Sequence, residues 1–137
     1  MELLAPAGTF GCVKAAVNSG ADAVYFAGQG FGARSFAGNL TDEEIFYAVD
    51  FCHLRGARAY ITVNTLVYDR EFGELEKFVK TITKAGADGV IVQDLGVMRF
   101  IKQVSPDIEL HASTQMTVHS LGGVKKLENE GVSRVVL

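Results

Sequence analysis

The chain has 137 residues, of which 48% are hydrophobic and 21% charged, as expected of a globular protein that buries a core. Its net charge of −3 gives no electrostatic support for binding nucleic acid or an anionic membrane through this segment. Cys12 and Cys52 are widely separated and lack metal-ligand spacing, so we expect no disulfide framework, no local metal site and a reducing, cytoplasmic environment.

The sequence also argues against a membrane location. No apolar run approaches the ~20 residues that a membrane-spanning helix needs. Residues 1–6 lack the basic segment and the long apolar segment of a signal peptide. We therefore expect a cytoplasmic protein with no membrane association.

Short apolar strand patterns alternate with amphipathic helix patterns along the whole chain. The predicted strands are residues 2–5, 23–26, 58–63, 89–92, a fifth starting at 109, and 133–137. Thr9, Thr41 and Asp94 are the predicted N-caps of the first, second and fourth helices, and Glu44 completes a capping box with Thr41. The third helix is expected to begin at 69 or 70, and the fifth to cover about 120–130.

One pattern recurs at the junctions between helix and strand. Residues 19–24, 85–90 and 130–135 each contain a helix-ending glycine, a short connection and a strand that carries valine. Residues 55–57 are a looser copy of it. A repeated unit of this kind, with six strands and five helices in alternation, predicts a parallel sheet.

Two parallel architectures fit this pattern. A doubly wound sheet would accommodate the whole length, whereas a (β/α)8 barrel typically needs ~250 residues. The recurring unit and the final strand at 133–137 favour an incomplete (β/α) barrel of TIM type. We therefore interpret residues 1–137 as one partial barrel domain, the N-terminal part of a longer protein, whose open sheet edges would promote self-association.

A glycine-rich loop covers residues 27–40, between the second strand and the second helix. Its glycines, Gly28, Gly30 and Gly32, do not have the spacing of a dinucleotide-binding motif, and no helix start follows them. We expect them to give a mobile lid.

Polar side chains follow four of the predicted strands. They are Arg34, Ser35 and Asn39; Asn64 and Thr65; Gln93 and Asp94; and His111, Ser113 and Gln115. In a parallel sheet these strand ends lie on one face, where ligands bind. The cluster predicts a site for a small polar or anionic ligand, in which an arginine could clamp a carboxylate or phosphate.

Each of these residues also has a structural interpretation. Asn64 and Asp94 suit a turn and a helix cap, and His111 could be a core histidine. As a functional pair, Asp94 would orient His111 as a general base. Tyr60 and Thr62 share the parity of Asn64, so they are expected to line the barrel interior.

Established catalytic motifs are absent from the sequence. There is no GxSxG nucleophile elbow, no HExxH zinc motif and no P-loop. Cys12 lies near a helix N-terminus, which could lower its pKa, but as a small residue of an amphipathic helix it is expected to be buried and inert.

Six segments resemble, in order along the chain, the collagenase-like proteases of peptidase family U32. They are ELLAPAG at 2–8, GADAVY at 20–25, FGARSFAGNLT at 31–41, VNTL at 63–66, VQDLG at 92–96 and LHASTQM at 110–116. The resemblance implies a (β/α)8-type N-terminal domain. Family members are described as proteases or collagenases, and others are implicated in hydroxylating tRNA or rRNA bases, with prephenate metabolism involved, or in oxygen-independent ubiquinone hydroxylation.

The resemblance further implies an iron–sulfur cluster in several members, on cysteines that follow the matched region. Neither Cys12 nor Cys52 matches such a position, so we expect no metal or cofactor in this chain and a possible cluster in the full-length protein. The leading hypothesis is a part of an RNA-base hydroxylation enzyme, inactive alone, whose RNA contacts come from elsewhere. A peptidase is the second hypothesis, and a non-catalytic ligand-binding barrel domain is the third.

Overall fold

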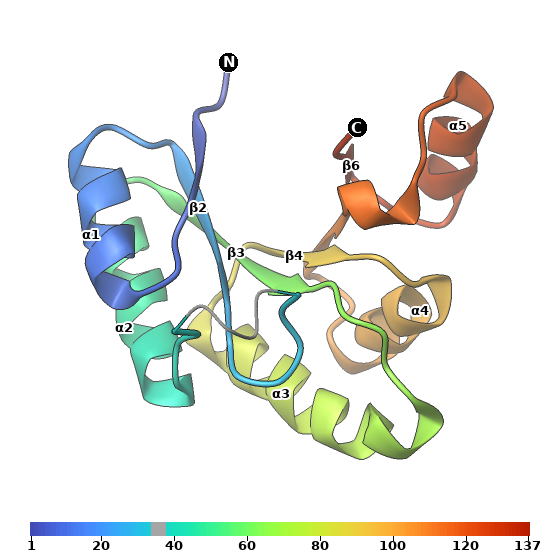
Figure 1. Cartoon of the computed structure of the whole chain (residues 1–137), viewed down its shortest axis with the longest axis horizontal. Helices are drawn as coiled ribbons and strands as arrows, with labels where there is room; N and C mark the ends of the chain where they lie inside the picture. The colour runs from blue at the N-terminus through green and yellow to red at the C-terminus, as the bar shows by residue number, and fades with distance from the viewer. Residues whose placement is uncertain (34–37) are drawn as a thin grey trace.

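The computed structural model describes residues 1–33 and 38–137, and within them six parallel strands form one sheet (Figure 1). The strands are β1 (Leu4–Pro6), β2 (Ala23–Ala27), β3 (Arg58–Val63), β4 (Gly89–Val92), β5 (Glu109–Ala112) and β6 (Arg134–Val135). Each strand pairs with the next one along the chain. This sequential order belongs to a barrel, because a doubly wound sheet reverses its order at a switch point.

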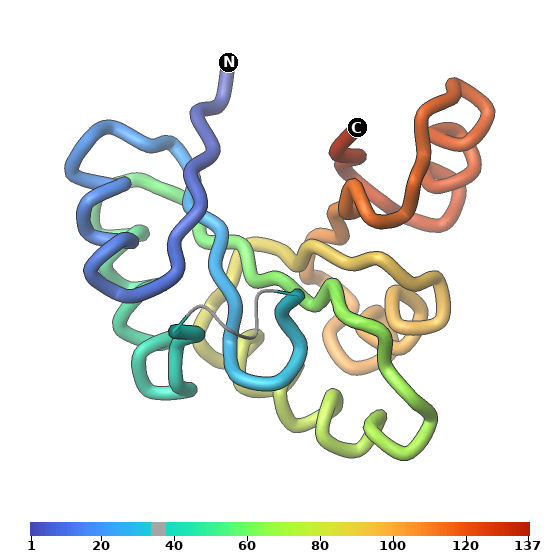
Figure 2. The backbone as a smooth tube through the Cα atoms, in the orientation of Figure 1, coloured from blue at the N-terminus to red at the C-terminus, as the bar shows by residue number. Residues whose placement is uncertain are grey.

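Helices connect successive strands and follow the outer side of the curved sheet (Figures 1 and 2). They are α1 (Phe10–Asn18), α2 (Asp42–His53), α3 (Phe72–Ala85), α4 (Leu95–Val104) and α5 (Leu121–Asn129), with 3₁₀ turns η1 (Asp69–Glu71) and η2 (Thr114–Met116). The chain is therefore a half-barrel of TIM type, as predicted. None of these helices, within the described part of the chain, is long and apolar enough to cross a bilayer.

The predicted N-caps are confirmed. Thr41 accepts a hydrogen bond from the Glu44 amide at 3.2 Å, and the Glu44 carboxylate accepts one from the Thr41 amide at 2.9 Å. Thr9 accepts from the Cys12 amide, and Asp94 accepts from the Val97 amide at 2.8 Å. Each side chain satisfies an amide that the first helical turn leaves unpaired, so local sequence determines where these helices begin.

Several element boundaries differ from the predicted ones by one or more residues, and two of these differences have a clear physical cause. The third helix begins with the turn η1, because the Glu71 carboxylate accepts from the Tyr68 amide at 2.7 Å and tightens the entry. Strand β1 runs to Pro6, although proline cannot donate to a sheet. Because β1 pairs only with β2 within the described residues, its proline lies on an edge strand, where the missing amide is tolerated.

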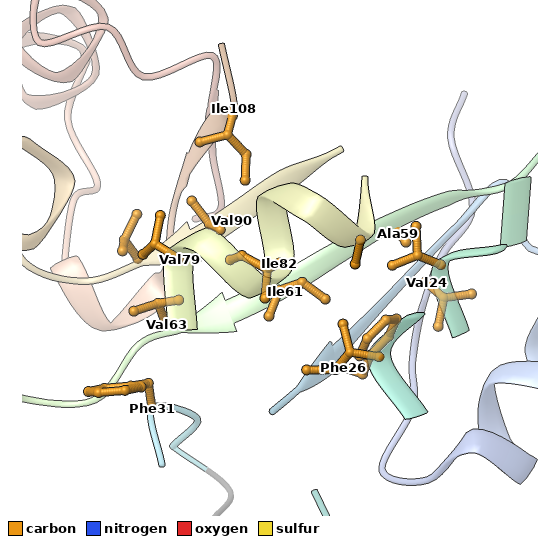
Figure 3. Packing of buried hydrophobic residues seen from close by; sticks show 14 of the residues in the cluster. Val24, Phe26, Phe31, Ala59, Ile61, Val63, Val79, Ile82, Val90 and Ile108 are labelled. Carbon is orange, nitrogen blue, oxygen red and sulfur yellow. The ribbon is translucent and has the colours of Figure 1, made fainter. Parts of the chain in front are cut away.

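The main core lies between the sheet and the helices. Figure 3 shows Ile61 and Val90 of the strands close to Ile82 and Val79 of α3, and Phe26 of β2 belongs to the same cluster. Each such side chain contributes about 1.5–3 kcal/mol when fully buried. Strand side chains alternate in direction, so this packing orients the intervening residues toward the barrel interior.

The amino-terminal ends of the strands are occupied by structural contacts. Asp88 Oδ2 accepts from the Ala59 amide at 2.7 Å and lies 2.9 Å from His53 Nε2, while Asp22 accepts from the Leu3 amide. The glycines that end the helices have positive φ, for example 84° at Gly86. The repeat found in the sequence therefore corresponds to the helix-to-strand junctions at the amino-terminal ends of the strands. A ligand site would lie at the opposite, carboxyl-terminal ends.

Candidate functional site

A pocket of about 420 Å³ lies at the carboxyl ends of the strands. Its lining comes from residues on or after all six strands: Leu4, Pro6, Ala7, Gly8, Tyr25, Phe26, Ala27, Ala33, Asn39, Thr62, Asn64, Ile91, Ser113, Thr114, Gln115 and Val136. Such a volume suits a small molecule or one nucleobase. Its position is where parallel barrels bind their ligands.

Four of the predicted binding residues meet in this pocket. Asn39, Asn64, Ser113 and Gln115 come from three separate segments and all line it. Thr62 lines it too, as its strand parity predicts. The described lining therefore offers hydroxyl and amide groups, with apolar side chains between them, and contains no charged side chain.

Asn64 fixes the first part of the glycine-rich loop against the end of β3. Its backbone N–H donates to the Phe31 carbonyl at 3.1 Å, and its side-chain Oδ1 accepts from the backbone N–H of Ala33 at 3.1 Å. The Thr65 hydroxyl donates to the same Phe31 carbonyl at 3.2 Å. The side-chain oxygen of Asn64 is thus engaged with the loop, which leaves its NH₂ group as the part that could serve a ligand.

Close packing explains two of the three glycines in the described residues 28–33, and backbone conformation explains the third. A Cβ on Gly28 would lie 2.5 Å from Phe78 Cε2, and one on Gly32 would lie 2.3 Å from the Cβ of Ala27. Gly30 differs, because its φ of 106° suits glycine. Gly28 and Gly32 therefore allow residues 28–33 to pack closely against the barrel, and the lid role of the loop stays a prediction.

The segment after β5 forms a compact polar turn. Ser113, 5% exposed, accepts from the Gln115 amide at 3.3 Å and donates to Gln115 Oε1 at 3.4 Å. Ser113 thereby caps η2, so its capping role and its position in the pocket coexist. Thr117 ends the turn with φ of 55°, which is unusual for a β-branched residue, and strained backbone of this kind is concentrated at functional sites.

His111 lies in the barrel interior and is 1% exposed. Its Nε2 is 3.1 Å from Glu109 Oε2, and its ring contacts the edge of Tyr60 with centroids 4.5 Å apart. Burial lowers the pKa of His111, and the hydrogen bond with Glu109 opposes that shift. His111 is not among the described residues that line the pocket.

The structure gives Asp94 a different partner from the one predicted. Its carboxylate caps α4, while the imidazole of His111 contacts Glu109, so no described hydrogen bond joins His111 to Asp94. Gln93 and Asp94 follow β4 outside the described lining. Arg34 and Ser35 lie outside the residues that the structure describes.

Cys12 contradicts the expectation that it is buried. Val13 and Val17 form the buried face of α1, which leaves Cys12 exposed. The Thr9 hydroxyl donates to its sulfur at 3.3 Å, and this bond, with backbone amides of Gly8 and Thr9, lowers the pKa of the thiol. Cys52 is buried as its helical position predicts, and burial raises the pKa of its thiol to about 11.

A network that was not predicted from the sequence joins the two edges of the sheet. Glu2 accepts from Arg134 Nη1 at 3.1 Å and from the Tyr60 hydroxyl at 3.3 Å. The hydrogen bond from Arg134 lowers the pKa of Glu2. Strand parity could have placed Glu109 beside His111, two residues along the same face, but no sequence signal pairs residue 2 with residue 134.

An iron–sulfur cluster does not fit the donors of this chain. Such clusters are typically held by four cysteine thiolates, and the chain has two cysteines, one exposed and one buried. In residues 1–33 and 38–137, no group of three or more His, Cys, Asp or Glu side chains is placed to hold a metal ion.

Curated relatives align with nearly the whole chain. The tRNA hydroxylation protein P1 of Bacillus subtilis (strain 168) is 40% identical over 136 residues, covering 99% of this chain and 32% of that protein. A 23S rRNA 5-hydroxycytidine synthase of Escherichia coli (strain K12) is 38% identical over 100% of this chain and 20% of its own length. A collagenase of Porphyromonas gingivalis (strain ATCC BAA-308 / W83) is 31% identical over 85% of this chain and 28% of its own length. The chain thus spans a fifth to a third of these relatives.

Solved structures confirm the fold. The U32 peptidase Mk0906 superimposes with a TM-score of 0.77 over 98% of this chain and 57% of that one, at 14% identity. The aldolase QR15 gives 0.72 over 98% and 67%, at 18% identity. The model of Peptidase family U32 matches residues 8–137. The chain therefore belongs to Peptidase family U32.

Proposed function

We propose that this chain is the N-terminal half-barrel of a longer enzyme of tRNA or rRNA base hydroxylation, and that its strand-end pocket binds the small polar substrate. The observation that carries the proposal is the meeting of Asn39, Asn64, Ser113 and Gln115 in one pocket of about 420 Å³. The names of the two relatives at 40% and 38% identity support RNA as the substrate class.

The character of the pocket favours a neutral, hydrogen-bonding ligand. Amide and hydroxyl groups can both donate and accept, which suits the edge of a nucleobase, while Pro6 and Ile91 provide apolar contact for its faces. An anionic ligand would need a cation such as Arg34, whose role remains a prediction. With a net charge of −3, the chain suits base binding better than binding to the RNA backbone, which we assign to other parts of the longer protein.

The remaining proposals concern the longer protein. We place it in the cytoplasm, where it would meet its RNA substrate, and we place any iron–sulfur cluster on cysteines outside this chain. Metal analysis of the purified chain should find no stoichiometric iron or zinc. About one metal ion per molecule would contradict this assignment.

A peptidase is the second candidate, favoured by the 31% identity with a collagenase. A peptidase needs a nucleophile paired with a base, or a metal-activated water. The Ser113 hydroxyl bonds with Gln115, and the His111 imidazole bonds with Glu109, so the described contacts do not form a serine–histidine pair. The local chemistry therefore favours ligand binding over peptide hydrolysis, and a non-catalytic binding domain is the third candidate.

Two assays separate the candidates. RNA from a strain that lacks the gene should lose a hydroxylated nucleoside in mass spectrometry, and the full-length gene should restore it. Purified full-length protein should leave gelatin and casein intact. Unchanged nucleosides, together with digestion that disappears in a His111→Ala variant, would establish the peptidase instead. If the hydroxylated nucleosides are unchanged and the protein digests neither gelatin nor casein, the result favours the non-catalytic binding domain.

A further inference from the structure

His111 carries an unsatisfied nitrogen in the barrel interior. Among the described residues, its Nδ1 is the one buried side-chain nitrogen or oxygen without a hydrogen-bond partner. An unpaired buried polar atom costs about 1–3 kcal/mol, so native structures rarely retain one without a reason. The atom therefore marks a place where a further hydrogen-bonding group would be stabilised.

The contact with Glu109 determines which kind of group that is. A carboxylate oxygen lies 3.1 Å from Nε2, and a carboxylate accepts hydrogen bonds, so Nε2 carries the ring proton. Burial of the ring, which lowers its pKa, favours the neutral imidazole. In that tautomer Nδ1 has a lone pair and acts as an acceptor.

The sheet register places this acceptor next to the pocket. His111 pairs with Ile91, which lines the pocket, and Ser113, two residues further along the same face, lines it as well. Tyr60 packs against the ring from β3, in a small interior cluster that also contains the lining residue Ile91. The imidazole thus lies on the strand position beside Ile91 and one inward-facing position before Ser113, both of which line the pocket.

We propose that Glu109 is a positioning residue: it fixes the tautomer of His111 so that Nδ1 accepts a hydrogen bond from an N–H or O–H group at the pocket floor. That donor belongs to the bound substrate or to a water molecule held beneath it. The identity of the substrate rests on the proposed function, whereas the tautomer and the positioning role of Glu109 do not.

The tautomer can be measured without any activity. Long-range ¹H–¹⁵N spectra of the labelled chain should show His111 with a protonated Nε2 and an unprotonated Nδ1. In Glu109→Gln the side-chain amide can donate to Nε2, so the proton should shift partly or wholly to Nδ1. Glu76→Gln, in an exposed pair with Lys80, is the matched control and should leave the spectrum unchanged. A protonated Nδ1 in the unmodified chain, or an unchanged tautomer in Glu109→Gln, would overturn the proposal.

The use of the acceptor is tested with the full-length protein in the deletion strain. Glu109→Gln should reduce the hydroxylated nucleoside about tenfold, which corresponds to about 1.4 kcal/mol of transition-state stabilisation, while Glu76→Gln restores it fully. Full restoration by Glu109→Gln, with the tautomer shifted, would show that the acceptor is not used. If the unmodified gene restores nothing, the proposed function fails, and the spectra still decide the tautomer.

A high-resolution crystal structure of the ligand-free chain identifies the source of the donor. Density for an ordered water within hydrogen-bond distance of Nδ1 assigns the donor to water, and an empty position assigns it to the substrate. A protein donor at Nδ1, such as a rotated Tyr60 hydroxyl, would overturn the proposal.

Discussion

His111 has the environment of a group whose protonation is linked to folding. Burial lowers its pKa in the folded chain below the ordinary value of about 6.5, although Glu109 opposes the shift. Arg134, Tyr60 and Glu2 are the other charged or titratable groups close to it. A group with a depressed folded pKa stabilises the protein above its unfolded pKa and loses that contribution as pH falls.

The first prediction concerns this pH dependence. The free energy of unfolding should fall between about pH 7.5 and pH 5.5, because the unfolded chain takes up a proton at His111 before the folded chain does. In His111→Gln the decrease should be smaller, as measured by urea unfolding at each pH. The control His119→Gln changes an exposed histidine and should keep the original slope. Equal slopes in all three proteins would contradict the burial argument.

Gly32 provides the second prediction, again at the residue scale. A Cβ at this position would lie 2.3 Å from that of Ala27, so Gly32→Ala should destabilise the fold by about 1–3 kcal/mol. Gly73→Ala is the control, because Gly73 lies in α3 with nothing within 4 Å of the added carbon. Alanine favours a helix, so this variant should be neutral or more stable by up to about 1 kcal/mol. Denaturant unfolding measures both, and a neutral Gly32→Ala would disprove the packing explanation.

At the scale of elements, the sequence predicted the features that depend on hydrogen bonds between residues close in the chain. Thr41 with Glu44, and Asp94, fix the starts of α2 and α4 through bonds within four residues, so the sequence shows them directly. Long-range contacts were not predictable in this way. The pairing of Glu2 with Arg134 depends on the curvature of the sheet, and the exposure of Cys12 depends on how α1 packs.

The same distinction applies to the site. Asn39, Asn64, Ser113 and Gln115 follow strands, and a parallel sheet brings strand ends together, so their convergence followed from topology. The proposed pair of His111 and Asp94 required knowledge of side-chain direction. In the structure Asp94 caps α4, and His111 contacts the carboxylate of Glu109.

The third prediction tests the capping box of α2. Thr41→Ala removes the hydroxyl that accepts from the Glu44 amide, and it should lower the free energy of unfolding by about 1 kcal/mol. Thr83→Ala in α3 makes the same chemical change where the hydroxyl donates to the Val79 carbonyl within the helix. There it should have little effect, because the backbone bonding of the helix remains. Similar losses in both variants would contradict a specific role for the cap.

At the scale of the whole molecule, the half-barrel has two edge strands. Within the described residues, β1 and β6 each have one strand neighbour, which leaves backbone groups able to pair with another chain. The network of Glu2, Tyr60 and Arg134 joins the segments that carry these edges across the interior. The sheet is therefore curved, and both of its edge strands have a side without a strand neighbour among the described residues.

The fourth prediction follows from these edges. The isolated chain should self-associate as its concentration rises, and multi-angle light scattering over a wide concentration range should show a growing mass. Association should be suppressed when strands that complete the barrel are present in the same polypeptide. A monomer at all concentrations would contradict the prediction.

The central claim is that the strand-end pocket serves RNA-base hydroxylation. Its most direct test is nucleoside mass spectrometry of RNA from the deletion strain, complemented with full-length protein in which Ser113 and Gln115 are both changed to Ala. The control changes Glu76 and Lys80, an exposed ion pair on α3, to Ala. We expect the pocket variant to lose hydroxylated nucleoside by at least about tenfold, or about 1.4 kcal/mol of transition-state stabilisation, and the control to restore it fully. Full restoration by the pocket variant, at equal protein level, would contradict it.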